Sequence, residues 1–454
     1  MTSGNIECTA ASNYAGGYVS GGGTFPHVLR TYKDNRMKKN IGVYIHIPFC
    51  ARKCAYCDFY SLQGSSVAAL MPKYHKALLR HIAESAQQLR GYYIDTVYFG
   101  GGTPSFYGAG RLIELFEALK NTGSVLIDCE VTAEVNPDSV TKADLLKMRR
   151  AGFNRLSVGV QSADDGMLRR IGRLHNFSQA EEAVVNARLA GFRNVSIDLM
   201  YGLPSQSREG WADTLTRAAA LKPDHISCYG LKLAEGTELY TFKDTPFIPD
   251  DDTQADMYLY AVEALSRFGY RQYEISNFAK RGFESRHNMK YWRGEEYISF
   301  GAAAHSYVGG LRYNYIADAD EYARRIMSGD PVVDQTEEIS TREQASEYLM
   351  LGLRTVQGIS EEEYRAIYPC SFEPIEDKLR FCAKHGLAVK NDGRWSLTPR
   401  GFLVSNVIIG EVLESQTQQH AILVRKLRPE QEDMQMGMTM FDKKQEEIPL
   451  FQGI

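Results

Sequence analysis

The chain has no apolar run long enough to cross a membrane, because nowhere do about 18 such residues follow one another. It also lacks a strong charge of either sign: 52 Lys and Arg face 56 Asp and Glu, for a net charge of -4. The even spread of basic residues excludes the positive stripe of a nucleic-acid-binding protein. The first residues lack the basic-then-apolar pattern of a signal peptide. We therefore expect a cytoplasmic protein with no nucleic-acid partner.

A disulfide framework is also missing. Eight unevenly spaced cysteines in 454 residues are more typical of reduced thiols than of paired ones. Three of them stand together in the spacing C-x3-C-x2-C, directly after an apolar segment: Cys50, Cys54 and Cys57. Thiolates are soft ligands that select iron–sulfur clusters, zinc or copper. We predict that these three cysteines bind metal.

Two kinds of metal site fit three cysteines. A four-iron cluster normally takes four cysteines, so three would leave one iron open to another ligand. A structural zinc ion needs four protein ligands, and His46 or Asp58 could supply the fourth. Ligand softness and ligand number favour a [4Fe-4S] cluster over zinc.

Short β-branched segments alternate with longer amphipathic ones from Ile41 onward. The predicted strands are Val43–Ile47, Thr96–Phe99, Val131–Val135, Leu156–Val160, Val195–Leu199 and Ile226–Tyr229. The predicted helices between and after them are Met71–Leu89, Gly110–Lys120, Lys142–Ala151, Ser178–Ala190, Trp211–Leu221 and Asp256–Phe268. This alternation predicts an α/β fold with a parallel sheet, either an open doubly wound sheet or a partial α/β barrel.

Polar or glycine residues stand where each predicted strand should end, and they favour the barrel. They are Cys50, Gly100 to Gly102, Glu134, Gln161, Asp198 and Tyr229. In α/β barrels, the loops at the carboxyl ends of the strands build the active site. A polar strand end is ordinary where a chain leaves the core, but six of them together predict one pocket at one rim.

Several of these residues suggest ligand contacts. The glycine triplet Gly100–Gly102 permits close backbone approach to a ligand, although tight turns use such triplets too. Glu134 could accept hydrogen bonds from ribose hydroxyls, or could be a solvated or helix-capping residue. Arg173 suits a carboxylate partner through its fork geometry. Gln161 and Asp198 are individually just as ambiguous.

The chain divides into four predicted parts. Residues 1–39 form a Gly-rich flexible leader, and residues 40–330 form the α/β domain. Residues 331–415 read as helices with a hairpin at Leu387–Leu397, where an Asn-Asp-Gly turn favours β-pairing. This pattern predicts a winged-helix-like C-terminal domain. Residues 416–454 are polar, and we predict a mobile tail there.

His287 lies in the stretch Arg286-His287-Asn288-x-x-Tyr291-Trp292, beside two aromatic residues and between two arginines. Haem sites combine an axial histidine with a flat apolar wall and cations for the propionates. A lone histidine is more often hydrogen-bonded within an ordinary loop. Haem ligation by His287 is therefore one hypothesis, and an ordinary hydrogen-bonded loop histidine is the other.

Six motifs together resemble the oxygen-independent coproporphyrinogen-oxidase-like radical S-adenosylmethionine (SAM) proteins, over about residues 41 to 412. The motifs are YIHIPFC at 44–50, CAYCDF at 54–59, GGGTPS at 100–105, EVNP at 134–137, GVQS at 159–162 and DLMYGLP at 198–204. The resemblance implies a partial (β/α)6 barrel with a helical C-terminal domain. It also implies that the three cysteines hold a [4Fe-4S] cluster whose open iron chelates SAM.

The resemblance assigns further residues by position. Tyr44, Gly101 and Glu134 would contact the cluster-bound SAM. The oxidases of this family bind a second SAM near residues matching Tyr56, Gly102, Thr103, Gln161, Arg173 and Asp198. Whether this chain keeps the second site stays open at this point.

Two positions separate the oxidases from a haem-chaperone branch of the family. Oxidases have a further cysteine two residues after the third cluster cysteine, where this chain has Phe59, and the chaperones carry the H-N-x-x-Y-W motif found at His287–Trp292. The resemblance thus implies a haem chaperone that delivers haem to haem-requiring respiratory proteins, with possible peripheral membrane association. The alternative is an oxygen-independent coproporphyrinogen III oxidase that decarboxylates propionate side chains.

Overall fold

The computed structural model describes residues 38–427, except for the side chains of Ser66 and residues 421–427. Most of the predicted leader and the tail from residue 428 lie outside the described residues. No helix in the described part of the chain is long and apolar enough to span a lipid bilayer.

Six parallel strands form the centre of the fold. They are β1 Lys39–Ile47, β2 Tyr92–Gly101, β3 Ser124–Val135, β4 Arg155–Gln161, β5 Asn194–Tyr201 and β6 His225–Gly230, and they pair in that order. All six predicted strands are confirmed. No described strand pairs β6 back to β1, so the sheet is a partial barrel that stays open.

Shorter strands extend the sheet on both sides to twelve strands. β9 Tyr297–Phe300 pairs parallel with β1, and β10 His305–Val308, β11 Leu311–Tyr315 and β12 Val333–Glu338 follow as antiparallel strands. On the far side β8 Asn277–Ala279 pairs antiparallel with β6, and β7 Arg271–Gln272 pairs with β8. The sheet of the α/β domain therefore continues past residue 330 into β12.

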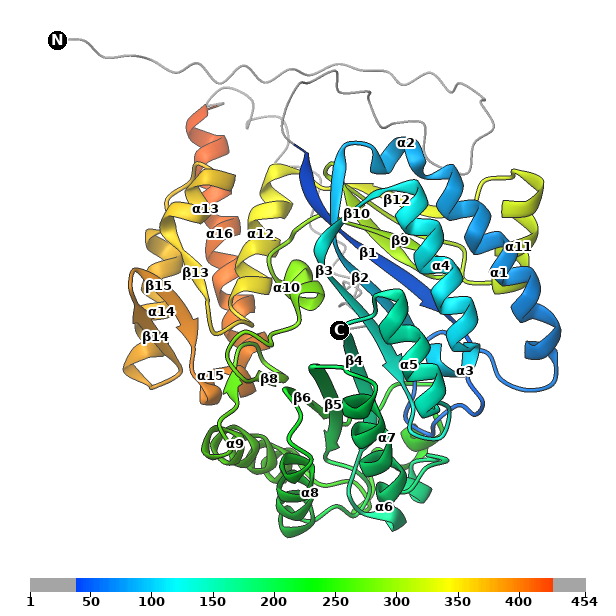
Figure 1. Cartoon of the computed structure of the whole chain (residues 1–454). Helices are drawn as coiled ribbons and strands as arrows, with labels where there is room; N and C mark the ends of the chain where they lie inside the picture. The colour runs from blue at the N-terminus through cyan, green and yellow to red at the C-terminus, as the bar shows by residue number, and fades with distance from the viewer. Residues whose placement is uncertain (1–37, 428–454) are drawn as a thin grey trace.

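Helices follow the strands, as predicted, and cover one face of the sheet (Figure 1). The predicted helices correspond to α1 Ser66–Glu84 with α2 Ala86–Leu89, α4 Ala109–Thr122, α5 Lys142–Ala151, α7 Phe177–Leu189, α8 Arg208–Ala220 and α9 Asp251–Arg267. Three short helices, α3 Pro104–Tyr107, α6 Asp165–Arg170 and η1 Glu238–Phe242, lie in the loops, and α11 Ala319–Ser328 packs against α1. Side-chain caps fix several starts, such as the Thr141 capping box of α5.

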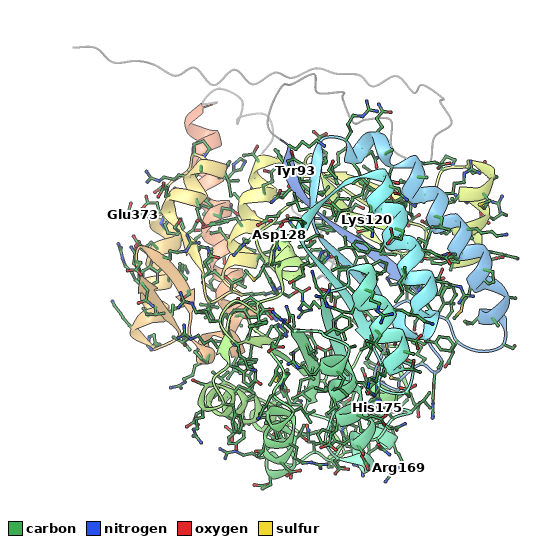
Figure 2. All side chains as sticks on the ribbon, in the orientation of Figure 1. Tyr93, Lys120, Asp128, Arg169, His175 and Glu373 are labelled. Atoms are coloured by element: carbon green, nitrogen blue, oxygen red, sulfur yellow. The ribbon has the colours of Figure 1, made fainter. Side chains whose placement is uncertain are left out.

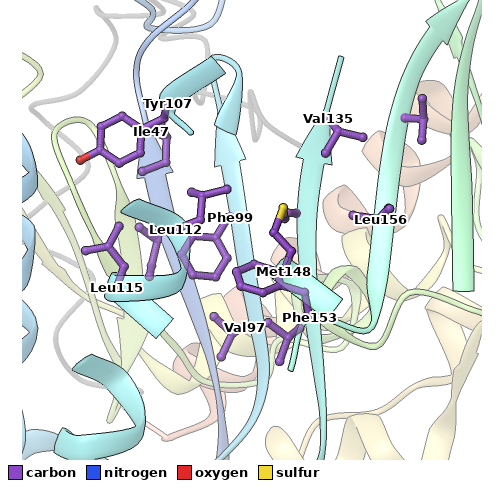
Figure 3. Close-up of a cluster of buried hydrophobic side chains, with 14 of the residues drawn as sticks. Ile47, Val97, Phe99, Tyr107, Leu112, Leu115, Val135, Met148, Phe153 and Leu156 are labelled. Atoms are coloured by element: carbon purple, nitrogen blue, oxygen red, sulfur yellow. The ribbon is translucent and has the colours of Figure 1, made fainter. Parts of the chain in front are cut away.

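Alternation along the six strands, interrupted by a few register shifts, gives the sheet two different faces. Figure 3 shows the apolar face, where Val97, Phe99 and Leu156 pack against Leu112 of α4 and Met148 of α5. A parallel sheet covered on both faces would show continuous apolar runs instead. The opposite face carries polar side chains, and we call this set of residues the "polar trough": Tyr44, His46, Thr96, Tyr98, Thr132, Glu134, Arg155, Ser157, Ser196, Asp198, His225, Ser227 and Tyr229.

The C-terminal domain stands beside the open side of the sheet (Figure 1). It contains α12 Thr341–Gly352, α13 Glu361–Ile367, α14 Glu373–Lys384, α15 Pro399–Leu403 and α16 Ser405–Leu427, with a small sheet of β13 Ile359–Ser360, β14 Ala388–Asn391 and β15 Arg394–Leu397. The predicted hairpin is confirmed, because Asn391 pairs with Arg394 across a two-residue turn. Its apolar core also takes in Tyr258 of α9, which joins the two parts.

The predicted tail begins too early. α16 continues to Leu427, so residues 416–427 are helical rather than a mobile tail. Gln416 is buried, and the Ser346 hydroxyl donates to its amide oxygen at 2.6 Å. Polar composition misled the prediction here, because the helix packs against both α12 and α14. The division into domains otherwise stays a proposal.

Candidate cluster and ligand site

The predicted site residues gather at the carboxyl ends of the strands. Figure 2 shows Arg169 and His175, which follow β4, at the opposite end of the molecule from Tyr93 and Asp128, near the starts of β2 and β3. The cysteine loop follows β1 at the same end as Arg169. As expected for a barrel, the loops of several strands therefore meet at one rim.

Backbone hydrogen bonds fix the cysteine loop. The Cys50 amide donates to the Leu62 carbonyl at 2.9 Å, and the Ala55 amide donates to the Ile171 carbonyl at 3.1 Å. Ala55 is also buried in a small apolar cluster with Leu168, and Tyr56 packs against that cluster. The loop is thus held from both ends before any ligand is considered.

Each of the three cysteine sulfurs receives a hydrogen bond. The Thr103 hydroxyl lies 3.4 Å from Cys50 Sγ, and Arg173 Nη1 lies 3.7 Å from Cys54 Sγ. The amide of Phe59 donates to Cys57. Donors aimed at sulfur stabilise thiolates and tune iron–sulfur centres.

Burial acts against these donors in the free protein. It raises the pKa of the Cys50 thiol and raises that of Cys57 to about 11, while the hydrogen bonds from Thr103 and Phe59 lower each pKa. Metal binding requires the deprotonated form. The hydrogen-bond donors around the three sulfurs therefore suit thiolates, whose negative charge a bound metal centre would neutralise.

Asn136 connects the donors to Cys50 and Cys54, and the sequence analysis missed this role. Its Nδ2 donates to Thr103 Oγ1 at 3.3 Å, and its Oδ1 accepts from Arg173 Nη2 at 2.6 Å. Arg173 also donates to the Gly159 carbonyl at 2.8 Å. A continuous chain of hydrogen bonds thus runs from Cys50 to Cys54. The EVNP motif contained the residue, but only the fold reveals its partners.

A zinc site with His46 as fourth ligand does not form here. Both ring nitrogens of His46 have protein partners, the Tyr44 hydroxyl at 3.0 Å and the Tyr60 carbonyl at 3.2 Å. Burial lowers the pKa of His46 to about 4. Within residues 38–427 no three His, Cys, Asp or Glu side chains converge on one metal ion. A four-iron cluster needs no such convergence, because each thiolate binds a different iron.

Gly101 is required by its surroundings. Its φ of +113° lies in the region that favours glycine, and an added Cβ would meet the His46 ring at 2.5 Å. The Gly101 amide donates to Glu134 Oε2 at 3.2 Å. The glycine triplet therefore allows the backbone at Gly101 to lie directly against the Glu134 carboxylate.

Glu134 lies in the polar trough between aromatic neighbours. The Tyr98 hydroxyl donates to Glu134 Oε1 at 2.9 Å, and the Tyr98 ring stacks with Tyr44 at 6.1 Å between centroids. Burial raises the pKa of the Glu134 carboxyl to about 8, although both hydrogen bonds lower it. The Glu134 carboxyl therefore keeps its proton to a higher pH than a free carboxyl, and the residue is only partly buried.

Gln161 and Asp198 complete the rim. Gln161 has a φ of +67°, which is rare for a residue with a side chain and which coincides with a register shift in β4. Strain of this kind is retained mainly at functional sites. Asp198 accepts hydrogen bonds from the Ser157 hydroxyl at 3.0 Å and 3.1 Å, and burial raises its pKa. Gly102 donates its amide to the Ile47 carbonyl and shapes the turn.

Both ring nitrogens of His287 have protein partners in this structure, so ligation of haem iron by His287 would require one of these hydrogen bonds to break. It is 1% exposed, its Nδ1 lies 2.8 Å from Thr96 Oγ1, and its Nε2 lies 2.9 Å from the Tyr291 hydroxyl. Its ring stacks on Tyr98 at 5.2 Å. Burial lowers its pKa to about 3. In this conformation His287 closes the base of the polar trough rather than presenting a metal ligand.

Helix α10 (Arg286–Trp292), which carries His287, is fastened to the sheet. Glu130 accepts the backbone amides of Arg286 and His287 at 3.2 Å and 3.0 Å. The buried Lys290 forms ion pairs with Asp95 and Glu295, each at 3.0 Å. These contacts hold α10 in place against the polar trough.

Comparison with known proteins agrees with this architecture. The model of the radical SAM superfamily matches residues 44–218, and that of the HemN C-terminal domain matches residues 339–404. A protein named Heme chaperone HemW from Bacillus subtilis (strain 168) is 35% identical over 377 residues, covering 82% of this chain and 98% of that protein. The chain belongs to the HemW family of radical SAM proteins.

Further similarities are consistent with that placement. The protein named Heme chaperone HemW from Escherichia coli (strain K12) is 31% identical, covering 81% of this chain and 97% of that protein. A solved structure titled as coproporphyrinogen III oxidase (HemN) from Escherichia coli has a TM-score of 0.74 at 22% identity, covering 83% of this chain and 91% of that chain. At that identity the similarity shows the shared fold.

Membership of the radical SAM superfamily implies a [4Fe-4S] cluster and SAM, and the residues present fit both. We propose that Cys50, Cys54 and Cys57 hold the cluster, because each sulfur has a donor directed at it. We propose that Tyr44, Gly101 and Glu134 contact SAM, because they meet at the adjacent rim. We propose that Tyr56, Gly102, Thr103, Gln161, Arg173 and Asp198 make further SAM contacts; Thr103 and Arg173 also form hydrogen bonds to the cysteines in this structure.

Replacing Glu134 by Gln tests its raised pKa. Between the ordinary value of 4.5 and about 8, the folded wild type holds a proton that the unfolded chain releases. Stability from this group is therefore lost as the pH rises through that window. The variant lacks this loss, so it should gain ~1–3 kcal/mol relative to wild type between pH 5 and pH 8. Thermal unfolding across that range measures the difference, and a pH-independent difference would contradict the assignment.

Replacing His287 by Ala separates a structural role from a ligand role. The loss of two buried hydrogen bonds and a stacked ring should lower stability by ~2–4 kcal/mol. Haem affinity per folded chain should stay unchanged. Exposed His385 replaced by Ala is the matched control for stability. A variant with wild-type stability and lost haem binding would restore His287 as the ligand.

Proposed function

We propose that this protein is a haem chaperone built on a radical SAM scaffold. The observation that carries the proposal is the 28–35% identity, over 70–83% of this chain, with relatives that are all named Heme chaperone HemW. Phe59 supports it, because this residue stands where the oxidases of the family have an additional cysteine. Its side chain is 42% exposed beside the cluster loop.

The haem recipients belong to the same proposal. We propose haem-requiring respiratory proteins as acceptors, reached from the cytoplasm at the membrane surface. Reduced cysteines support a reducing compartment, since all seven cysteines in the described part of the chain are free. Haem or a related porphyrin would be the cargo.

When bound, the cluster and SAM together supply one-electron chemistry, and the cofactor rather than the protein carries that step. The protein's own residues do the rest. The three cysteines fix the cluster, and Thr103 and Arg173 hold the sulfurs by hydrogen bonds. Glu134 and Gly101 would position the ligand at the rim, and the apolar faces of the helices exclude water from the other side of the sheet.

An anaerobic assay of cluster-reconstituted protein decides between chaperone and oxidase. The protein is given SAM, a reductant and coproporphyrinogen III, and both protoporphyrinogen IX and 5′-deoxyadenosine are followed. A parallel titration measures haem binding. We expect stoichiometric haem binding and no multiple-turnover formation of protoporphyrinogen IX.

The matched variants are Cys50→Ala, which should lose any 5′-deoxyadenosine formation, and Cys129→Ala, a buried cysteine remote from the cluster loop, which should not. Protoporphyrinogen IX formed over many turnovers would make the protein an oxidase. Absence of haem binding would equally overturn the proposal.

A further inference from the structure

Arg155 is a buried cation without a hydrogen-bond or ion-pair partner among the described residues. It is the first residue of β4 and is 2% exposed, and its Nε has no hydrogen-bond partner. No described residue forms a hydrogen bond or ion pair with its guanidinium. A buried charge normally requires a paired, hydrogen-bonded setting, because leaving water is costly. The protein therefore keeps a charged guanidinium at a position where burial is unfavourable.

The Arg155 charge acts inside the polar trough. It lowers the pKa values of Glu134 and Asp198 and of the hydroxyl of Tyr98, without a hydrogen bond to any of them. It also lowers the pKa of His287 from the base of the trough. Groups on four elements thus lie around this one cation, next to the residues proposed to contact SAM.

A second unsatisfied donor stands beside Arg155. Thr132 of β3 pairs in register with Arg155, and its buried hydroxyl also lacks a partner. Tyr98 and Tyr44 continue the same row across β2 and β1. One buried cation and one buried hydroxyl on adjacent strands form a donor pair that matches the two oxygens of a carboxylate.

We propose that Arg155 and Thr132 form a subsite for a carboxylate of the bound ligand. The carboxylate is either a propionate of haem or porphyrin or the carboxylate of SAM. The first of these two rests on the proposed function. Neither Glu134 nor Asp198 neutralises the guanidinium directly, which leaves that task to the ligand.

The variants Arg155→Met, Arg155→Lys and Thr132→Val test the subsite in the full-length, cluster-reconstituted protein. Exposed Arg271→Met is the matched control. Three quantities are measured for each: the thermal midpoint without ligand, the affinity for haem and for haem dimethyl ester, and the affinity for SAM. The ester carries the same macrocycle with its carboxylates blocked.

Arg155→Met should keep or raise the midpoint, because it removes an unpaired buried charge. It should weaken haem binding at least tenfold and leave ester binding unchanged, while Arg155→Lys keeps part of the affinity and Thr132→Val weakens it less. A tenfold loss for SAM with haem unchanged would assign the subsite to SAM instead.

Two results overturn the proposal. One is unchanged affinity for both haem and SAM in Arg155→Met. The other is a lowered midpoint or failure to fold, since Arg155 would then be paired within the protein, for example with the unsatisfied Asn194 Oδ1 opposite it. If the wild type binds no haem, the proposed function fails, and the SAM and stability measurements still decide the role of Arg155.

Discussion

The period of two along six parallel strands is the constraint on which the rest of this protein depends. It sends Val, Ile, Leu and Phe to one face, where they pack on the helices, and sends Tyr, Glu, Arg, Ser and Asp to the other. A one-residue shift in any strand would exchange the faces. Because the strands are parallel, their carboxyl ends also meet at one rim, which brings loops distant in sequence to the cysteines.

The rim is organised by hydrogen bonds more than by hydrophobic contact. The connection from Cys50 through Thr103, Asn136 and Arg173 to Cys54 joins loops that follow four different strands. It ties the geometry of the thiols to the positions of β2, β3 and β4. The strained backbone at Gln161 lies in the same region, where the register of β4 with β5 shifts between Gly159 and Gln161. Such a site is built before any ligand arrives.

The sequence predicted the parts that depend on local pattern. The six strands, the helices between them and the hairpin follow from periodicity and turn residues. The cysteines, Gly101 and Glu134 were proposed as site residues from their spacing or from their place at strand ends. What it could not predict were partners that the fold alone brings together. Thr96 and His287 are 191 positions apart, yet they share a hydrogen bond. Asn136 and Arg155 were not predicted for the same reason. Asn136 matters because of the partners that the fold brings to it, and Arg155 because it has none among the described residues.

The central claim is that three cysteines with donors to each sulfur hold a cluster with one iron left open for SAM. Electron paramagnetic resonance of the reduced, reconstituted protein, recorded with and without SAM and alongside iron and sulfide analysis, tests it most directly. The account predicts about four irons and four sulfides per chain, and a spectrum that changes when SAM is added. A colourless protein loaded with zinc, or a cluster whose spectrum ignores SAM, would contradict it.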